Sequence, residues 1–212
     1  MSNAKKILIA DDHAIFREGL KQVIASTVDL SVTDEATNSQ EALNKVHDND
    51  YDIVILDISM PGRSGLDCLV EIKKMKPNLP VLVLSMHPEE QYALRAYKSG
   101  ASGYLTKGGP TEELLEALHK IALGKKYVSS ALADKLISDL GKPHGTDVQS
   151  SLSNREYQVL CLLASGKPVG KIADELALSV KTISTYRGHI LRKLNMNNNA
   201  ELTRFAIENQ LV

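Results

Sequence analysis

Residues 53–62 read IVILDISMPG, a run of four aliphatic residues followed by an aspartate and a turn that contains proline and glycine. Consecutive aliphatic residues of this kind are typical of a short strand that is buried on both faces. A carboxylate is costly to remove from water, so Asp57 at the end of such a strand requires an explanation. Taken alone, an aspartate in this place is usually a turn or cap residue. The surrounding sequence is therefore needed to assign it.

The first 125 residues alternate aliphatic strands with segments of helical periodicity. Strands are predicted at 6–10, 30–35, 53–57, 81–85 and 103–106. Helices are predicted at 14–25, 39–46, 65–75, 89–98 and 111–123. Five such repeats predict an α/β fold, in which helices cover both faces of a doubly wound, five-stranded parallel sheet of order 2-1-3-4-5.

The ends of these strands carry hydrophilic residues. In the predicted order the first and third strands are neighbours, which brings Asp11, Asp12 and Asp57 to one edge of the sheet. The fourth strand ends in Ser85, and Lys107 follows the fifth. Each residue alone has an ordinary explanation as a turn, cap or surface residue, but the five together favour a functional site.

Three neighbouring carboxylates repel one another unless a cation neutralises them. Oxygen ligands of this kind suit Mg²⁺, so the sequence predicts a magnesium site. A bound cation would leave Asp57 ionised and able to attack phosphorus as a nucleophile. Lys107 would stabilise charge on the phosphoryl oxygens, and the hydroxyl of Ser85 would hydrogen-bond the phosphate of the product.

The composition is that of a soluble globular protein, with 43% apolar and 24% charged residues in a chain of 212, which is long enough for two small domains. No apolar run is long enough to span a membrane, and acidic residues begin too early for a signal peptide. Cys68 and Cys161 lie far apart in apolar contexts, which is typical of reduced cysteines in a cytoplasmic protein.

The second half of the chain is expected to be wholly helical. A helix beginning near Ser129 is followed by residues 141–153, GKPHGTDVQSSLS, whose helix breakers indicate a linker. Further helices are predicted at 154–164, 169–176, 180–194 and 200–209. The chain is thus divided into an α/β domain at residues 5–123, a linker with a short helix at 124–149 and a small all-α domain at 150–212.

Charge is distributed unevenly between the two parts. Residues 1–150 contain 17 Lys and Arg against 21 Asp and Glu, whereas residues 151–212 contain 8 against 5. An acidic first part and a basic second part suggest two different tasks. The basic part is the one that we expect to meet nucleic acid.

The helix predicted at 180–194 is amphipathic, and Ser179 suits its N-cap. One side carries Val180, Ile183, Ile190, Leu191 and Leu194. The other side carries Lys181, Thr185, Gly188, His189 and Arg192. A cationic helix with an apolar back fits the major groove of DNA, where phosphate contacts would make binding sensitive to salt. A solvated basic face is the alternative.

The segments ILIADD, ILDISMPG, LVLSMH and GYLTKG occur in this order within residues 5–123. In this combination they resemble the receiver domain of two-component response regulators. The resemblance implies that a sensor histidine kinase phosphorylates Asp57. It also implies that Asp12, Asp57 and the backbone carbonyl of Ser59 bind Mg²⁺ directly, while Asp11 acts through water.

The same resemblance assigns roles to residues at the ends of the fourth and fifth strands. Lys107 and Ser85 are expected to contact the phosphoryl group. Ser85 and Tyr104 are expected to form the switch, in which the aromatic ring moves inward when the hydroxyl turns toward phosphate. Simple packing at the sheet edge is the alternative explanation of Tyr104.

The segments LSNREYQVLCLLASGK, KIADELALSVKTIS and HILRKLNM lie within residues 150–212. They resemble the LuxR-type helix-turn-helix domain that NarL/FixJ regulators join to a receiver, with the helix-turn-helix itself at about 169–194. The resemblance implies structural roles for Glu156, Gly166 and Leu194. It also implies that the last helix mediates dimerisation, with plain packing as the alternative for half of this helix, and a dimer would bind paired half-sites on DNA.

In that family Ser184, Thr185 and Gly188 would face bases, while Lys181 and Thr182 would meet phosphate. Because Ser184 and Gly188 are small, base readout can pass to their neighbours. The candidate DNA-contact residues are Lys181, Thr182, Ser184, Thr185, Tyr186, Arg187, Gly188, His189, Arg192 and Lys193.

The expected function is that of a cytoplasmic, non-enzymatic transcription regulator, which is switched by phosphate and forms a homodimer on double-stranded DNA. Two alternatives stay open at this point. The domains could act without phosphate, or Asp57 could serve an aspartyl-nucleophile phosphotransferase. Phosphotransferases of the haloacid dehalogenase type place a second acid two residues after the nucleophile, where this chain has Ser59.

Overall fold

The computed structural model describes residues 4–60, 64–139, 151–209 and 211–212. It divides into two compact units, Met1–Leu132 and Ala133–Val212, and each is described by itself. The turn predicted at Pro61 and Gly62 and most of the breaker-rich segment 141–153 lie outside the described residues. No helix in the described part of the chain is long and apolar enough to cross a bilayer.

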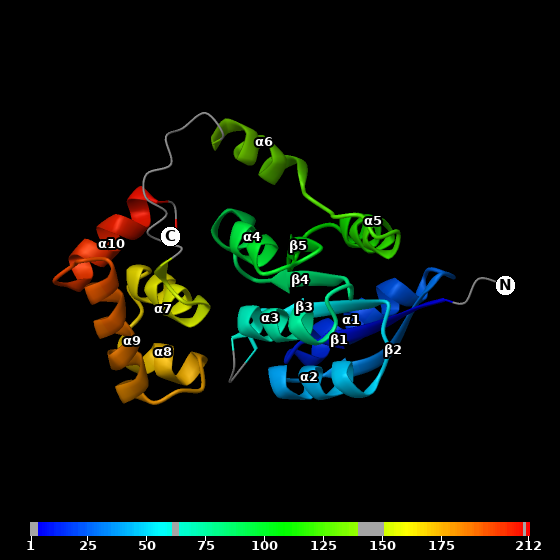
Figure 1. Ribbon diagram of the computed structural model, residues 1–212, viewed down its shortest axis with the longest axis horizontal. Helices are drawn as coiled ribbons and strands as arrows, with labels where there is room; N and C mark the ends of the chain where they lie inside the picture. The colour runs from blue at the N-terminus through cyan, green and yellow to red at the C-terminus, as the bar shows by residue number, and fades with distance from the viewer. Residues whose placement is uncertain (1–3, 61–63, 140–150, 210) are drawn as a thin grey trace. The chain divides into compact units, whose positions relative to one another are not determined.

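The first unit is built on a five-stranded parallel sheet in the order β2-β1-β3-β4-β5 (Figure 1). The predicted order is therefore confirmed. The strands are β1 (Lys5–Ala10), β2 (Leu30–Ala36), β3 (Ile53–Asp57), β4 (Val81–Ser85) and β5 (Gly103–Thr106). All residues of β3 and β4 are buried, which is the physical reason why these strands read as unbroken aliphatic runs.

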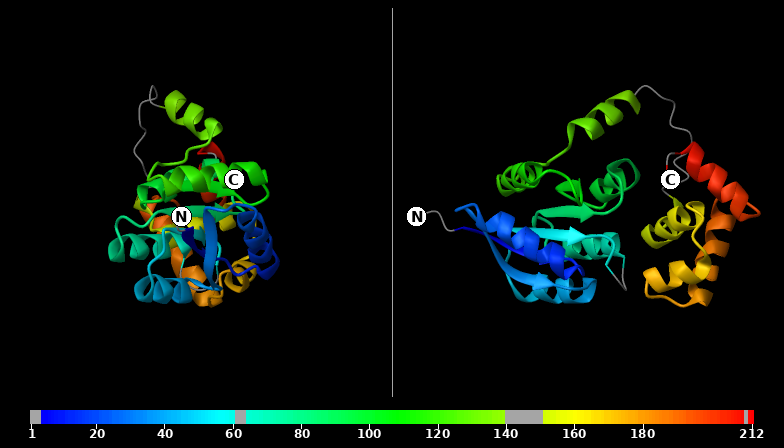
Figure 2. Two further views of the ribbon diagram at one scale, coloured as in Figure 1. Left: turned by 90° about the vertical axis from the view of Figure 1, so that its right-hand side faces the viewer. Right: turned by 180° about the vertical axis from the view of Figure 1, so that it is seen from behind.

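Five helices connect and cover the strands, as Figure 2 shows from two further sides. They are α1 (Ala14–Ala25), α2 (Ser39–Asp48), α3 (Gly65–Met75), α4 (Glu89–Lys98) and α5 (Thr111–Ala122). One core cluster joins Leu20 and Ile24 of α1 with Leu118 and Ile121 of α5 over the same face of the sheet. The predicted boundaries differ from these by at most two residues.

The register of the strands aligns their carboxyl ends. Ala10 of β1 lies beside Leu56 of β3, so the residue that follows each of them begins the same edge. Asp57 lies beside Leu84 of β4, the residue before Ser85. Because parallel strands run in one direction, this register brings the acids and Ser85 to one edge of the sheet.

The chain remains attached to the first unit after α5. Tyr127 belongs to the core cluster, its hydroxyl donates to Glu113 at 2.9 Å, and its carbonyl accepts from Tyr97 at 2.5 Å. Ser129 then caps α6 (Ser130–Asp139) by accepting from the amide of Leu132 at 3.1 Å. The first residues of the predicted linker are thus packed within this unit.

The second unit begins within α6, and four further helices pack around one central helix. These are α7 (Asn154–Ala164), which is central, α8 (Val169–Glu175), α9 (Val180–Lys193) and α10 (Asn199–Glu208). α7 is buried over nearly its whole length and contacts α8, α9 and α10. A capping box fixes its start, since Ser153 and Glu156 each accept a hydrogen bond from the other's main-chain amide.

Candidate functional site

Four side chains meet at the carboxyl edge of the sheet. Oxygen or nitrogen atoms of Asp11, Asp12, His13 and Asp57 all lie within 4.8 Å of one another. Asp11 and Asp57 are only 2% and 1% exposed, while Asp12 and His13 face solvent. The cluster is therefore open on one side, and its deepest members are two carboxylates that need a compensating charge.

Lys107 supplies one such charge. Its Nζ lies 2.6 Å from Asp57 Oδ2 and 2.6 Å from Asp11 Oδ2, and its side chain is 4% exposed. Its main-chain amide donates to the carbonyl of Ser85 at 2.6 Å, which fixes the loop after β5 to the end of β4. A single ammonium group thus neutralises one of the two buried carboxylates, and one negative charge remains.

Burial and the uncompensated negative charge both affect the pKa of Asp57. Burial raises the pKa of this carboxyl, and the opposing influence of Lys107 and of the Ser59 amide, which donates at 2.7 Å, does not cancel the effect. A second cation beside the carboxylates would remove this imbalance. The hard oxygen donors suit a divalent cation, and Ser59 Oγ is buried without a hydrogen-bond partner among the described residues.

Ser85 ends β4, and Tyr104 lies within the neighbouring strand β5. Both are fully buried, and the Tyr104 hydroxyl donates to the carbonyl of His87 at 2.9 Å and contacts the Ser85 hydroxyl. Ser85 Oγ accepts from the His87 amide at 3.0 Å. Burial raises the pKa of Tyr104, so it stays a neutral donor at physiological pH. The β4–α4 loop is thereby tied to β5.

His13 was not among the residues selected from the sequence. Its Nδ1 lies 3.1 Å from Asp12 Oδ1 and 3.3 Å from Asp11 Oδ1, and its main-chain amide donates to Asp11 at 2.8 Å. Its position directly after two acids was the available signal. We regard His13 as a residue that restrains both acids.

In the second unit, α9 presents a mostly polar outer face. Lys181, Ser184, Thr185 and Arg192 are exposed. Ser179 caps the helix as predicted, accepting from the Thr182 amide at 3.0 Å. Partly exposed positions on this helix are Thr182, Tyr186, Arg187, Gly188 and His189.

The apolar back of α9 differs from the prediction at one residue. Ile183, Ile190 and Leu194 are buried and Leu191 is half-buried, but Val180 is 54% exposed. Val180 is the first residue of the helix, so the neighbouring elements do not cover its side chain. Helical periodicity assigns an angle to a residue but does not show how far the packed core extends along the helix axis.

Two basic candidates on α9 are already engaged inside this unit. Lys193 Nζ lies 2.6 Å from Glu156 Oε2 and donates to the carbonyl of Ser151 at 3.2 Å. Arg187 Nε donates to Asn199 Oδ1 at 2.5 Å. These contacts favour structural roles for Lys193 and Arg187, whereas Lys181 and Arg192 extend into solvent.

The carboxylate of Glu156 accepts hydrogen bonds both from Lys193 and from the main-chain amide of Ser153. Burial alone would raise its pKa, but hydrogen bonds from Lys193 and from Ser153 outweigh burial and hold the pKa below its usual value of 4.5. The carboxylate therefore stabilises the folded state fully above pH 4.5, and this contribution is lost as pH falls through the lowered pKa.

We expect Glu156→Gln to lower the free energy of unfolding of the second unit by about 1–3 kcal/mol at neutral pH, because a neutral amide keeps the capping acceptor but loses the charge that pairs with Lys193. Hydrogen exchange of α7 peptides in the full chain measures this effect. The difference from the wild type should shrink as the pH falls below the usual glutamate pKa. A difference that does not change with pH would contradict the assigned role.

An acidic cluster at the carboxyl edge of a doubly wound sheet, followed in the chain by a helical unit with a capped, mostly polar helix, is typical of an aspartate-bearing receiver joined to a helix-turn-helix DNA-binding domain. Comparisons agree with this class. Residues 7–119 match the response regulator receiver domain, and residues 150–206 match the luxR family of bacterial regulatory proteins. The chain belongs to the two-component response regulators of the NarL/FixJ family, and it is a DNA-binding regulator of transcription.

Named relatives support this assignment over the whole chain. The oxygen regulatory protein NreC of Staphylococcus carnosus is 35% identical over 98% of this chain and 99% of its own. The response regulator UvrY of Escherichia coli is 31% identical over 97% and 94%. RcsB of Salmonella enterica, solved on the rprA promoter with the phosphomimetic BeF3−, is 28% identical, with a TM-score of 0.67 over 96% and 98%.

Proposed function

We propose that Asp57 is the phosphoacceptor of this response regulator and that a sensor histidine kinase is the donor. The observation that carries the proposal is the position of Asp57, a buried carboxylate 2.6 Å from Lys107 and within 4.8 Å of the other acids. An oxygen of Asp57 would attack phosphorus as the bond from phosphorus to the imidazole nitrogen of the donor breaks. The acyl phosphate forms, and the imidazole leaves.

The residues of the cluster divide this chemistry among them. Asp12, Asp57 and the carbonyl of Ser59 would hold Mg²⁺ directly, and Asp11 would act through water. The cation supplies charge neutralisation of the phosphoryl oxygens. Lys107 would exchange one carboxylate partner for a phosphoryl oxygen, which keeps its ammonium paired throughout the reaction.

Ser85 and Tyr104 would transmit the change. The acyl phosphate adds a charge near −2 at this edge, and Ser85, which follows the residue beside Asp57, carries a hydroxyl at the end of β4. If Ser85 turns to phosphate, it releases the His87 amide, and Tyr104 holds the same loop through the His87 carbonyl. The β4–α4 loop is thus the element whose two arrangements the phosphate would bias.

The second unit would bind duplex DNA through α9. Lys181 and Thr182 at the start of the helix would contact phosphate, and Ser184, Thr185 and Gly188 would face bases. Tyr186, His189 and Arg192 complete the outer face. We propose a homodimer on paired half-sites; an RcsB structure contains two dimers on two DNAs. Because its DNA and kinase partners act in the cytoplasm, we place the protein there.

The decisive experiment measures DNA affinity with and without a small phosphodonor. Binding sites are first selected from random DNA, and the wild type is then titrated with and without acetyl phosphate and Mg²⁺. We expect tighter binding after phosphorylation. If acyl phosphate forms but the affinity for DNA is unchanged, the result would support a regulator whose DNA binding does not depend on phosphate. Steady turnover of a phosphomonoester would instead support an enzyme.

Lys181 and Lys193 form a matched pair for the DNA interface. Lys181→Ala should weaken binding similarly on every sequence and reduce the slope of log affinity against log salt by about 1, because one phosphate contact is lost. Lys193→Ala should leave this slope unchanged and lower stability, because its partner is Glu156. Fluorescence anisotropy at several salt concentrations gives both slopes. Equal slopes for the two variants would contradict the proposed orientation of α9.

A further inference from the structure

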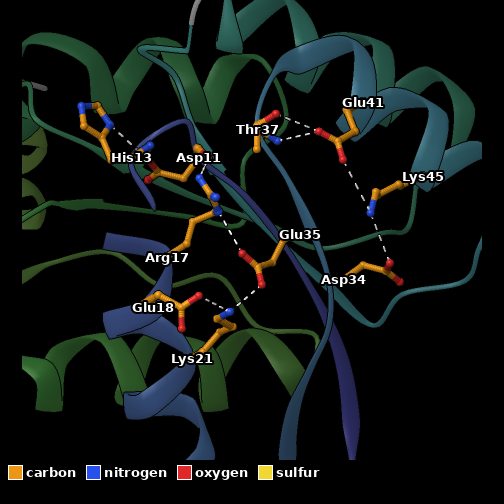
Figure 3. A network of polar contacts seen from close by, with 10 residues as sticks. All are labelled: Asp11, His13, Arg17, Glu18, Lys21, Asp34, Glu35, Thr37, Glu41 and Lys45. Carbon is orange, nitrogen blue, oxygen red and sulfur yellow. Dashed lines mark hydrogen bonds and ion pairs between the residues drawn. The ribbon is translucent and has the colours of Figure 1, made fainter. Parts of the chain in front are cut away.

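The loop between β1 and α1 carries Asp11 and Asp12. The side chain of Arg17, on α1, donates a hydrogen bond to the main chain of this loop. Figure 3 shows this residue between α1 and β2. Arg17 Nη1 donates to the main-chain carbonyl of Asp11 at 2.7 Å, and its Nε donates to Glu35 Oε2 at 2.9 Å. The side chain is 13% exposed, so its position is fixed by packing as well as by hydrogen bonds.

The carbonyl that Arg17 contacts lies between the two acids in the main chain. It belongs to the peptide group that joins Asp11 to Asp12, and such a group is planar. Fixing this carbonyl therefore fixes the plane that contains the main-chain nitrogen and Cα of Asp12, and so the point from which the Asp12 side chain extends. The amide of Asp11 is held separately, by the carbonyl of Ala36 at 3.0 Å. Asp12 itself is exposed, so little packing restrains it from the solvent side.

The positive charge of Arg17 is balanced by the carboxylate of Glu35. Hydrogen bonds from Lys21 and then from Arg17 lower the pKa of Glu35, so this carboxylate is ionised at neutral pH. The Arg17–Glu35 pair therefore adds little net positive charge near the acids. An arginine without such a partner would compete with a divalent cation, whereas a paired arginine restrains the loop without doing so.

We propose that Arg17, supported by Glu35, is a positioning residue for divalent-cation binding by Asp11 and Asp12. The inference rests on the proposed function of the cluster. Groups that orient metal ligands without touching the metal commonly change metal affinity by about 10–100-fold when they are removed. The guanidinium suits this task because its planar fork reaches two acceptors at once, and a lysine cannot do so in the same geometry.

The chain provides a matched control one helical turn away. Lys21 also donates to Glu35, at 2.6 Å, but its other partner is Glu18, and no contact joins it to Asp11 in the described structure. Arg17→Gln and Lys21→Gln therefore each remove one cation from Glu35. Only Arg17→Gln removes the bond to the Asp11 carbonyl.

Calorimetric titration of the full chain with MgCl2 tests the inference directly. The dissociation constant should rise about 10-fold or more in Arg17→Gln. It should change by less than about 2-fold in Lys21→Gln, whose losses are confined to two partly exposed pairs, with Glu18 and with Glu35. Arg17→Lys should lie between wild type and Arg17→Gln, and it serves as the test if Arg17→Gln does not fold.

Phosphorylation by acetyl phosphate separates positioning from a general structural role. In Arg17→Gln the Mg²⁺ concentration for half-maximal rate should rise, while the rate at saturating Mg²⁺ recovers to the wild-type value. Unchanged Mg²⁺ affinity in Arg17→Gln, or in Arg17→Lys where it is the test, would overturn the inference. A wild type that binds no Mg²⁺ and accepts no phosphate would instead overturn the proposed function, so the two failures are distinguishable.

Discussion

Asp57→Asn is expected to abolish acyl phosphate formation and, with it, the phosphodonor-dependent gain in DNA affinity. An amide cannot act as the nucleophile, and the neighbouring carboxylates of Asp11 and Asp12 are expected to hold the cation rather than to attack phosphorus. Phos-tag gels after treatment with acetyl phosphate and Mg²⁺ measure the first effect, and DNA titration measures the second. Phosphate retained by Asp57→Asn would move the acceptor to another residue.

The same substitution has a second effect, on stability. Burial raises the pKa of Asp57, so the folded state holds this proton to a higher pH than the unfolded chain. The wild type therefore loses stability as pH rises through the folded pKa, and the asparagine variant does not. Without Mg²⁺, hydrogen exchange of β3 should be slower in Asp57→Asn than in wild type at pH 7. The difference should vanish below the usual aspartate pKa of 3.8.

Lys107→Met is expected to lower the free energy of unfolding of the first unit by about 3–5 kcal/mol without Mg²⁺, because it leaves two buried carboxylates without a counter-charge. Asp57→Asn leaves Lys107 and Asp11 as a neutral pair, whereas Lys107→Met leaves two negative charges. Saturating Mg²⁺ should restore much of the loss. Differential scanning calorimetry with MgCl2 or with EDTA measures both effects.

A surface lysine supplies the control for this prediction. Lys120 pairs with Glu116 at 2.7 Å on α5, and both side chains are about half exposed. Lys120→Met should change stability by less than about 1 kcal/mol, with no response to Mg²⁺. If Lys107→Met were as mild as Lys120→Met, the buried ion pairs would not be what balances the acidic cluster.

Much of the first unit could be predicted from local patterns. The bounds of β3, β4 and β5 were predicted as they occur, and for β3 and β4 the reason is that strands buried on both faces read as nearly continuous aliphatic runs. The meeting of Asp11, Asp12 and Asp57 followed from one further rule, the order of parallel strands in a doubly wound sheet. Residues at strand ends could therefore be brought together before any contact was known.

The contacts of other residues could not be predicted from local patterns. Arg17 appears in the sequence only as a polar residue in the first turn of a helix, and its two partners lie on different elements. Lys193 is among the candidate DNA contacts, and its ion pair with Glu156 could not be foreseen because Glu156 lies 37 residues away in the chain. Tyr127 follows the last predicted helix of the α/β domain, and only packing shows that it belongs to the core.

Periodicity and strand order are local or topological properties, so the amino-acid sequence was enough to predict the elements, their order and the residues at the edge of the sheet. The pairing of side chains at that edge depends on tertiary packing. Lys107 lies between two carboxylates, and Arg17 reaches the Asp11 carbonyl, because distances of a few ångströms depend on how whole elements pack. Coulomb and hydrogen-bond energies change steeply over such distances, so charge balance at the acidic cluster is a property of the packed protein.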